Sequence, residues 1–369
     1  MKSFSQKLFI FLVFLGVYFI GFSNSFAQDA NQLLQEGIAF HDARKYDKAL
    51  KKYEQALKLI PNSPVIHYEM ALTYFDKKNY KTAIKYSDKV IKSKSQSIIS
   101  AYVIKGSSLD MLGKTQKSIK LFEGVIKKYP ENYLLHYNLA LNYYKIGELK
   151  KAEQSLMSAI GVNPEHTSSH LMLGYVEFDM GRKIPSMMAF NYFLFLEPTS
   201  QRSDRAFEFL NKQLLGSTKK GENNEITINI GGGSLGDNEF GAIELVMSIT
   251  QASKSMDLKK ELEEVLNEEL EKEDSQRTEK VVIMDETPKT EEEIFEANTK
   301  LFFSLLDGKD KNNNIWWVFY APTFNTLEES EHITTFCYWI SQQSNENASK
   351  WVEENSEKVL ELKKWIAKN

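Results

Sequence analysis

The sequence predicts a mainly α-helical protein: a right-handed superhelical solenoid of five helix-turn-helix repeats, followed by a small, mostly helical C-terminal region with one short strand. Two observations predict the solenoid. Pro130, Pro164 and Pro198 are spaced 34 residues apart. Small residues keep the same period in two series: Gly37, Ala71, Gly106, Ala140 and Gly174, and Ala49, Ala83, Ser118, Ala152 and Ser186. A fixed period of this length is typical of stacked repeats.

Residues 1–27 have the features of a secretory signal peptide. Lys2 and Lys7 precede an apolar run from Leu8 to Phe22, and Ser25-Phe26-Ala27 places small residues where a signal peptidase cleaves. We therefore expect cleavage near Ala27 and a periplasmic or secreted protein. The alternative is an uncleaved anchor, although the apolar run is at the short end of the about 20 residues that span a bilayer.

Within each repeat, a glycine or a polar pair separates the two helices. These breaks are Arg44-Lys45, Lys78-Asn79, Gly113-Lys114, Gly147-Glu148 and Gly181-Arg182. The small residues allow the first helix to approach the second closely, and each proline ends a second helix because it has no N–H to donate. Stacking supplies the core, and a polar helix must close it. Ser203 to Leu215 is predicted to be this closing helix, with Ser203 as its N-cap, so the solenoid should span residues 30–215.

The pattern over residues 30–200 resembles the tetratricopeptide repeat (TPR), because it recurs five times in register. Some positions depart from the family. The early aromatic residue of the first helix is replaced by Leu33, His67, Tyr102, His136 and His170, the second repeat has no terminal proline, and Glu177 stands at a usual aromatic position. The resemblance implies a protein-binding scaffold without chemistry of its own.

The resemblance also implies that the first helices line a concave groove. The family's inward positions, carried over repeat by repeat, give the candidate partner-binding residues, which we call the groove positions: Leu34, Ile38, His41, Tyr68, Leu72, Phe75, Val103, Tyr137, Leu141, Tyr144, Leu171, Tyr175 and Phe178. Such an apolar and aromatic groove favours an extended or helical peptide with apolar anchors. The occupant is either a partner protein or the C-terminal half of the same chain, and the same rings are also suited to packing between repeats.

Charge divides the chain into two halves. Residues 30–215 contain 27 Lys and Arg against 18 Asp and Glu, whereas residues 216–369 contain 17 against 31. The second helices are rich in lysine, as at Lys48, Lys51, Lys52, Lys58, Lys81, Lys85, Lys89 and Lys92. This basic convex face is either a contact for an anionic envelope surface or a solvated face. It lacks the interleaved aromatic residues of a nucleic-acid groove, so no nucleic-acid partner is expected.

The C-terminal half matches no family that we recognise. Residues 216–224 are predicted to be a linker, and residues 225–369 an acidic, mostly helical region. Glu225 to Ile230 alternates like a short strand, and helices are expected at about 239–250, 292–306, 326–343 and 348–367. Residues 231–236 formally satisfy GxGxxG, but the next strand with a terminal acid comes too late for a dinucleotide fold. No cofactor and no specific small molecule are therefore expected.

The sequence indicates no catalytic residue and no metal site. His67, His136 and His170 occupy one equivalent position, but neighbouring repeats separate equivalent atoms by on the order of 10 Å, too far for one metal ion. Cys337 lies on an apolar helix stripe and is expected to act as a small hydrophobic residue. We therefore predict a non-catalytic scaffold of the bacterial cell envelope that binds a polypeptide through the groove positions. The alternative is an exported hydrolase with its site in the C-terminal region.

Overall fold

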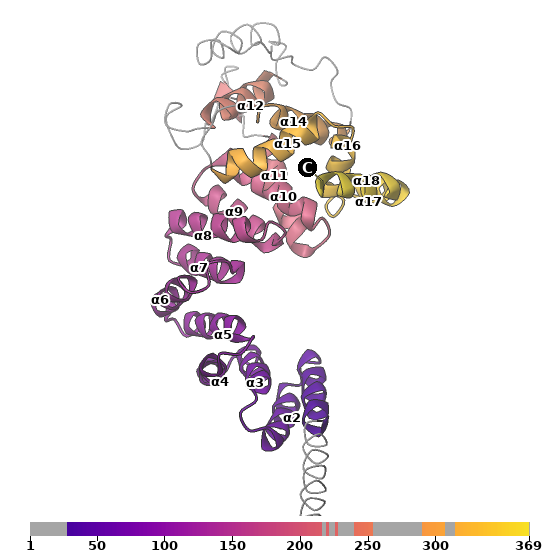
Figure 1. Ribbon diagram of the computed structural model, residues 1–369. Coiled ribbons are helices and arrows are strands. Elements are labelled where there is room, and N and C mark those ends of the chain that lie inside the picture. The colour runs from indigo at the N-terminus through magenta and orange to yellow at the C-terminus, as the bar shows by residue number, and fades with distance from the viewer. Residues whose placement is uncertain are drawn as a thin grey trace, which may run out of the picture. The chain divides into compact units, whose positions relative to one another are not determined.

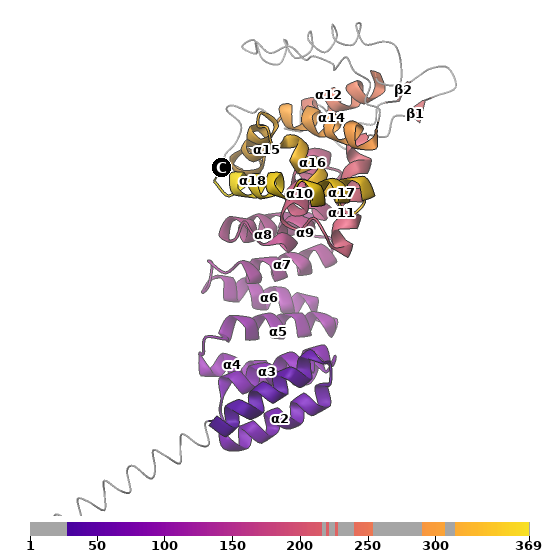
Figure 2. The same ribbon diagram turned by 90° about the vertical axis from the view of Figure 1, so that its right-hand side faces the viewer.

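The structure, a computed structural model, describes residues 28–215, 219–220, 226–227, 240–253, 290–306 and 314–368. Helices dominate these residues (Figures 1 and 2). The chain divides into two compact units, one up to Glu148 and one from Leu149, so the boundary falls between the two helices of the fourth repeat. The predicted signal peptide, the GxGxxG segment and the linker residues other than Lys219 and Lys220 lie outside the described residues.

All five predicted helix pairs are present. The first unit contains a helix over residues 28–42, α2 (Tyr46–Leu59), α3 (Pro64–Asp76), α4 (Tyr80–Ser93), α5 (Ile98–Met111), α6 (Thr115–Ile126) and α7 (Tyr133–Lys145). The second unit continues with α8 (Leu149–Val162), α9 (Thr167–Asp179), α10 (Lys183–Leu196) and α11 (Gln201–Leu215). The predicted solenoid fold is thus confirmed.

The five predicted breaks all contain a residue in the left-handed region of backbone space. The φ angles are 56° at Arg44, 63° at Lys78, 73° at Gly113, 78° at Gly147 and 72° at Gly181. Such a residue ends the first helix and turns the chain into the second. Glycine adopts this conformation without strain, whereas Arg44 and Lys78 do so at a cost.

The small residues allow a close approach of the two helices, as predicted. A Cβ atom on Gly106 would lie 2.2 Å from the ring of Phe122 on α6, and one on Gly174 would lie 2.6 Å from Phe190 on α10. The serines of the second series add a hydrogen bond between the same helices. Ser118 donates to the carbonyl of Gly106 at 2.8 Å, so a small polar residue serves both packing and helix pairing.

The start of α11 differs from the prediction. The helix begins at Gln201, and the backbone N–H of Ser203 donates to Oγ of Ser200 at 3.1 Å, so Ser200 and not Ser203 is the N-cap. Ser203 instead lies within the first turn and donates to the carbonyl of Glu197 at 2.5 Å. Ser203 is buried, because the end of α10 covers it.

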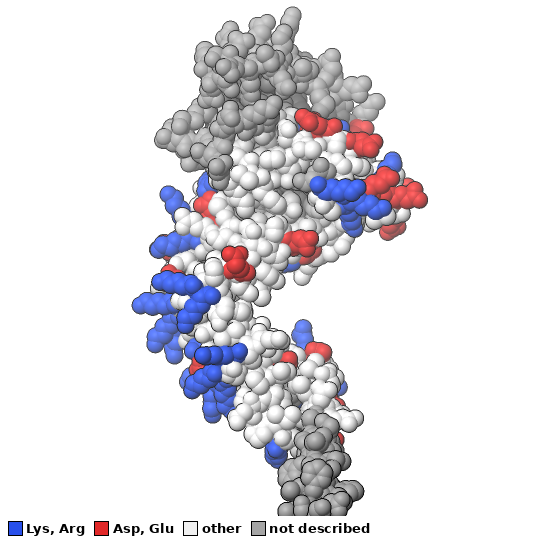
Figure 3. All heavy atoms as spheres, viewed as in Figure 1, with Lys and Arg blue, Asp and Glu red and all other residues white. Residues whose placement is uncertain are grey.

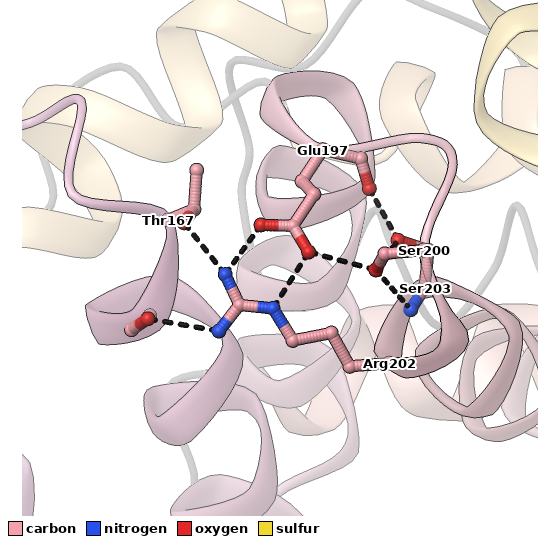
Figure 4. Close-up of polar contacts among 6 residues, drawn as sticks. Thr167, Glu197, Ser200, Arg202 and Ser203 are labelled. Carbon is pink, nitrogen blue, oxygen red and sulfur yellow. Dashed lines mark hydrogen bonds and ion pairs between the residues drawn. The ribbon is translucent and has the colours of Figure 1, made fainter. Parts of the chain in front are cut away.

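A polar network joins α9, α10 and α11 at this point (Figure 4). Arg202 forms a two-pronged ion pair with Glu197, in which Nε lies 2.6 Å from Oε1. The other guanidinium hydrogens reach Ser168 at 2.9 Å and Thr167 at 3.0 Å at the start of α9. The guanidinium also lies over the ring of Phe193. One side chain thereby fixes the entry of α11 against the fifth repeat.

The described part of the C-terminal region is mostly helical, as predicted, but two of the predicted helices are each divided in two. The helices of this region are α12 (Gly241–Ser253), α14 (Glu291–Ser304), a π-helix η1 (Trp316–Tyr320), α15 (Ala321–Glu328), α16 (Ile333–Ser341), α17 (Glu346–Glu354) and α18 (Ser356–Ile366). The helix predicted at 326–343 is broken where Ser330 Oγ accepts the N–H of His332. That predicted at 348–367 is broken at Asn355, which has non-helical dihedral angles.

Within the strand predicted at residues 225–230, the structure describes residues 226–227, which form β2 (Ile226–Thr227). It pairs antiparallel with β1 (Lys219–Lys220), which lies in the segment that we predicted to be a linker.

The second unit has α10 at its centre. Ten consecutive or near-consecutive residues of this helix are buried: Ile184, Pro185, Ser186, Met187, Met188, Ala189, Phe190, Asn191, Phe193 and Leu194. Helices α9, α11, α12, α16 and η1 all pack against it. The described C-terminal helices therefore complete the core of the last repeat. Helix α11 is not terminal, because α14 packs against it through Phe295 and Phe207, whose ring centroids are 5.0 Å apart.

Candidate polypeptide-binding groove

In each first helix, the groove positions lie between the buried face and the solvent. On α3, Ile66, Met70 and Ala71 are buried, whereas Tyr68, Leu72 and Phe75 are partly exposed. The same division holds along the set, since twelve of the thirteen groove positions are partly exposed and Phe178 is exposed. The positions carried over from the family therefore present apolar and aromatic surface, and none of them is buried in the core.

The groove positions also take part in packing. Tyr68, Leu72 and Phe75 contact the buried cluster of Ala71, Ala83 and Ile104, and burial raises the pKa of the Tyr68 hydroxyl. In such positions one edge of a ring stabilises the stack of repeats while the rest stays accessible. Both interpretations of these aromatic residues, packing and recognition, thus apply to the same side chains.

Polar side chains connect neighbouring first helices beside the apolar positions. Nδ1 of His41 lies 2.8 Å from Oγ1 of Thr73, and its Nε2 lies 3.2 Å from a carboxylate oxygen of Asp76. His41 is a groove position, but both of its ring nitrogens are engaged within the protein. Its contribution to a partner is consequently limited to the ring.

Lys145 lies at the C-terminal end of α7, the helix that carries the groove positions Tyr137, Leu141 and Tyr144. Its Nζ donates to both carboxylate oxygens of Asp110 at 2.9 Å, and Thr115 donates to the same carboxylate at 2.6 Å. A partner's C-terminal carboxylate would have to displace Asp110 from Lys145. This arrangement favours recognition of apolar anchors over recognition of a chain terminus.

In the second unit, the groove positions of α9 meet a helix of the same unit. The ring of Phe209 on α11 lies edge-on to Tyr175 at 5.4 Å and to Phe178 at 4.9 Å between centroids. Tyr175 also packs edge-on against Phe190. Tyr175 is therefore held from two sides, which makes it a weaker candidate for a partner contact than the tyrosines of α7.

The three equivalent histidines have structural partners. Nε2 of His136 lies 2.7 Å from the carbonyl of Pro130, and Nε2 of His170 lies 2.7 Å from that of Pro164. Each bond ties a first helix to the turn before it. His67 is buried against Tyr86. A proline stands six residues before each of the three histidines, but the buried Nε2 of His67 has no hydrogen-bond partner among the described residues, so this spacing alone does not predict the bond.

His170 also contacts the C-terminal region. Its Nδ1 lies 2.6 Å from the hydroxyl of Tyr320 on η1, a residue 150 positions away. Burial lowers the pKa of His170 to about 4, so the ring is neutral near pH 7. A second hydrogen bond between the C-terminal helices and the last repeat runs from Nε1 of Trp339 on α16 to the carbonyl of Phe195 on α10, at 2.9 Å. The C-terminal helices thus meet the last repeat at α10 and at the His170 side of α9.

A cavity of about 120 Å³ lies within the second unit, between α11, α14 and α16. Its lining combines aromatic and acidic side chains: Phe207, Asn211, Glu291, Glu292, Phe295, Glu296, Cys337, Tyr338, Ser341, Ser344 and Asn345. Hydrogen bonds from its own backbone N–H, from Asn347 and from Asn345 lower the pKa of Glu292 to about 2. Burial raises the pKa of the Cys337 thiol, which is 3% exposed, so Cys337 is a packing residue as predicted.

The chemistry of this cavity does not favour hydrolysis. A general acid or base works best with a pKa near the operating pH, whereas Glu292 stays ionised and Cys337 stays protonated near pH 7. None of the described residues that line the cavity is a histidine. In the described part of the chain, no three or more His, Cys, Asp and Glu side chains are grouped so as to hold a metal ion. The absence of catalysis and of metal nevertheless remains a prediction.

Among the described residues, no helix combines the length and the apolar character that crossing a membrane requires.

Comparison with known proteins places the repeats in one family. A family model described as "TPR repeat" matches residues 37–78. Two further models described as "tetratricopeptide repeat" match residues 65–97, 100–132 and 133–166. A TPR repeat-containing protein of Methanocaldococcus jannaschii is 30% identical over 119 residues, which are 32% of this chain and 21% of that protein. The anaphase-promoting complex subunit CDC16 of Saccharomyces cerevisiae is 27% identical over 143 residues, 37% of this chain and 17% of the subunit.

A shorter match, 39% identical over 49 residues, is to the Hsp70-Hsp90 organising protein of Plasmodium falciparum, and it covers 13% of this chain and 9% of that protein. The chain thus spans about a fifth or less of the length of the curated relatives that it matches. Among solved structures, a thermophilic TPR protein of Thermus thermophilus is 20% identical, with a TM-score of 0.43, and the alignment covers 50% of this chain and all of that one. YrrB, described as a TPR protein with an unusual peptide-binding site, is 14% identical with a TM-score of 0.36, covering 49% of this chain and 93% of that one.

Proposed function

Because residues 37–166 of this chain are tetratricopeptide repeats, a scaffold typical of protein–protein interaction, we propose that it is a non-catalytic protein that binds a polypeptide through its groove positions. The observation that carries the proposal is the partial exposure of apolar and aromatic side chains at equivalent positions of successive first helices. Rigid rings at a regular spacing offer large contact area for a small loss of conformational entropy. The expected ligand is an extended or helical segment with apolar anchors.

We further propose that the protein works in the bacterial cell envelope after cleavage near Ala27. The support is the composition of residues 1–27, in which two lysines precede an apolar run and small residues stand at the cleavage point. N-terminal sequencing of the exported protein tests this: a mature chain that begins at Gln28 supports it, and an intact Met1 in the membrane fraction contradicts it.

The groove is tested most sharply on α7, where two adjacent tyrosines differ in position. Tyr144 is a groove position, whereas Tyr143 donates to Glu123 on α6 at 2.6 Å. Both are partly exposed, so Tyr144→Ala and Tyr143→Ala remove the same atoms from the same helix. The probes are fluorescent peptides of about 15 residues with aromatic anchors at helical or alternating spacing, and peptides with serine at those positions.

Binding of the anchored peptides should weaken about tenfold or more in Tyr144→Ala, because burying one large apolar side chain stabilises a complex by about 1.5 to 3 kcal/mol. Tyr143→Ala should bind as the original chain does, after correction for the folded fraction from thermal melting. Equal losses in the two variants, or equal binding of the serine peptides, would show that the groove positions serve packing alone.

A further inference from the structure

The second helices of the first three repeats, including the C-cap of α6, carry two rows of lysine at equivalent positions. Lys51, Lys85 and Lys120 form one row, and Lys58, Lys92 and Lys127 form the other, which we together call the lysine lattice. All six side chains are exposed. The two rows are seven residues apart, about 10 Å along a helix axis. The lattice ends at the fourth repeat, where Gln154 and Gly161 take the equivalent positions.

On α4 and α6 the acidic residues are directed elsewhere, whereas the exposed Glu54 lies between Lys51 and Lys58 in the sequence of α2. Asp88 is the one acid of α4, and it accepts a hydrogen bond from Lys105 on α5 at 2.7 Å. Glu123 is the one acid of α6, and it accepts from Tyr143 on α7. Both carboxylates therefore serve contacts with first helices. In the described part of the chain, no lattice lysine forms an ion pair.

The outcome is a basic surface over α4 and α6 of the first unit. Figure 3 shows Lys and Arg side chains gathered along one edge of the repeats, over α4 and α6. Gly124, which lies on this face of α6, has open space where a Cβ would stand, so no bulky side chain interrupts the surface. A stretch of unpaired positive charge attracts anionic partners that are themselves extended.

We propose that the lysine lattice docks on a bilayer surface that contains anionic phospholipids. Lysine is a flexible point charge that needs no fixed geometry, which suits the mobile headgroups of a fluid membrane. Nucleic-acid grooves use arginine forks and accessible aromatic platforms. Arg44 is the one arginine in residues 28–148, and Tyr86, the aromatic residue on α4 next to the lattice, stacks on Tyr74 and lies beneath Lys89 at 4.7 Å.

This docking is independent of polypeptide binding. The lattice lies on second helices and the groove positions on first helices, so a membrane-docked chain keeps its groove positions available. The lattice would therefore place a polypeptide-binding surface at the membrane without a spanning segment.

The test uses the chain from Gln28 onward, so that the apolar run of residues 8–22 cannot insert. Co-sedimentation with phosphatidylglycerol vesicles is compared with co-sedimentation with phosphatidylcholine vesicles. The variant Lys85→Gln/Lys92→Gln/Lys120→Gln removes three lattice charges. The matched control, Lys212→Gln/Lys364→Gln/Lys368→Gln, removes three exposed charges from the second unit. A third variant carries arginine at the three lattice positions.

Each lysine near an anionic surface contributes a factor of about five in affinity, so the lattice variant should bind phosphatidylglycerol roughly 100-fold more weakly. Binding should also fall steeply as salt rises from about 0.05 M to about 0.5 M, because the Debye length shrinks. The control and the arginine variant should bind as the original chain does. All six positions are exposed, so melting temperatures should agree.

Equal binding to the two lipids, or unchanged binding of the lattice variant, would overturn the proposal. Tighter binding to a duplex DNA oligonucleotide than to phosphatidylglycerol vesicles at the same salt would also overturn it, and would assign the lattice to nucleic acid.

Discussion

The contact of Gly106 with Phe122 gives the sharpest prediction for a single residue. Gly106→Ala places a methyl group 2.2 Å from the Phe122 ring, so we expect a loss of about 1 to 3 kcal/mol from overpacking. Gly124→Ala on α6 has open space around the new methyl group and should stabilise by about 0.5 to 1 kcal/mol through helix propensity. Urea unfolding of both variants measures the difference, and a neutral Gly106→Ala would mean that the helices separate at little cost.

His170 should make stability depend on pH. Because burial lowers its folded-state pKa to about 4, the unfolded chain binds more protons than the folded one between pH of about 4 and about 6.5. The free energy of unfolding that depends on a neutral His170 ring is therefore fully present above this pH window. It is lost as the pH falls through the window, by up to on the order of 3 kcal/mol.

The comparison variant is His170→Gln, which cannot titrate and should lose less stability than the original chain between pH 7 and about 5. His136→Gln serves as control, since His136 makes the same bond to a proline carbonyl but lies in a partly exposed position. Urea midpoints at the two pH values measure the effect. An unchanged pH dependence in His170→Gln would contradict the assignment.

At the residue scale, the sequence predicted where a residue lies on its helix better than it predicted which distant residue it contacts. The groove positions were carried over from the TPR resemblance, whereas Cys337 could be placed because Ile333, Phe336 and Ile340 share its apolar helix stripe. Tyr320 as the partner of His170 could not, since the two residues are 150 apart and no local pattern links them. The engagement of Lys145 by Asp110 was equally hidden, because it joins two first helices.

At the scale of elements, the break between the two helices of a repeat has a preferred residue. Lys78 has a φ of 63° at the end of α3, where glycine carries no steric penalty. A side chain in the left-handed region costs about 1 to 2 kcal/mol, and glycine removes this cost but loses more backbone entropy on folding. Lys78→Gly should therefore stabilise the protein by about 1 kcal/mol.

The neighbouring residue provides the control. Lys77 has a φ of −71°, in the right-handed region, so Lys77→Gly should destabilise by about 0.5 to 1 kcal/mol. Thermal melting of the two variants gives shifts of opposite sign if the turn conformation decides stability. Shifts of the same sign would assign the effect to the lost lysine charge.

The elements that could be predicted are those with a repeated signal. Five breaks and ten helices follow one period, so an error in one repeat is corrected by the others. The C-terminal helices lack that redundancy. Their breaks depend on single contacts, such as the Ser330 hydroxyl and the conformation of Asn355, and such contacts leave no distinct pattern in the sequence.

At the scale of the molecule, the second unit joins the last repeats to the C-terminal helices in one core. The signal in the sequence was the composition of α10, KIPSMMAFNYFLFL, which is apolar around its whole circumference. A second helix of a repeat normally leaves one face in solvent. An all-round apolar helix must be covered on that face too, and here η1 and α16 cover it through rings such as Tyr192 against Phe319 and Phe195 against Phe336.

This arrangement predicts the behaviour of a chain that ends at Leu215. Although it contains all five repeats, it lacks the helices that cover α10, so we expect it to bind a hydrophobic dye, to self-associate and to melt below the full chain. Burying a large apolar side chain stabilises by about 1.5 to 3 kcal/mol, so exposing several rings together removes a substantial part of a typical stability.

The truncated chain with Tyr192→Lys and Phe195→Glu should stay monomeric, since the uncovered face is then polar. Light scattering and dye fluorescence on the two truncated chains decide the matter. A soluble, dye-free truncated chain with native Tyr192 and Phe195 would show that the repeats close their own core and that the C-terminal helices are an accessory.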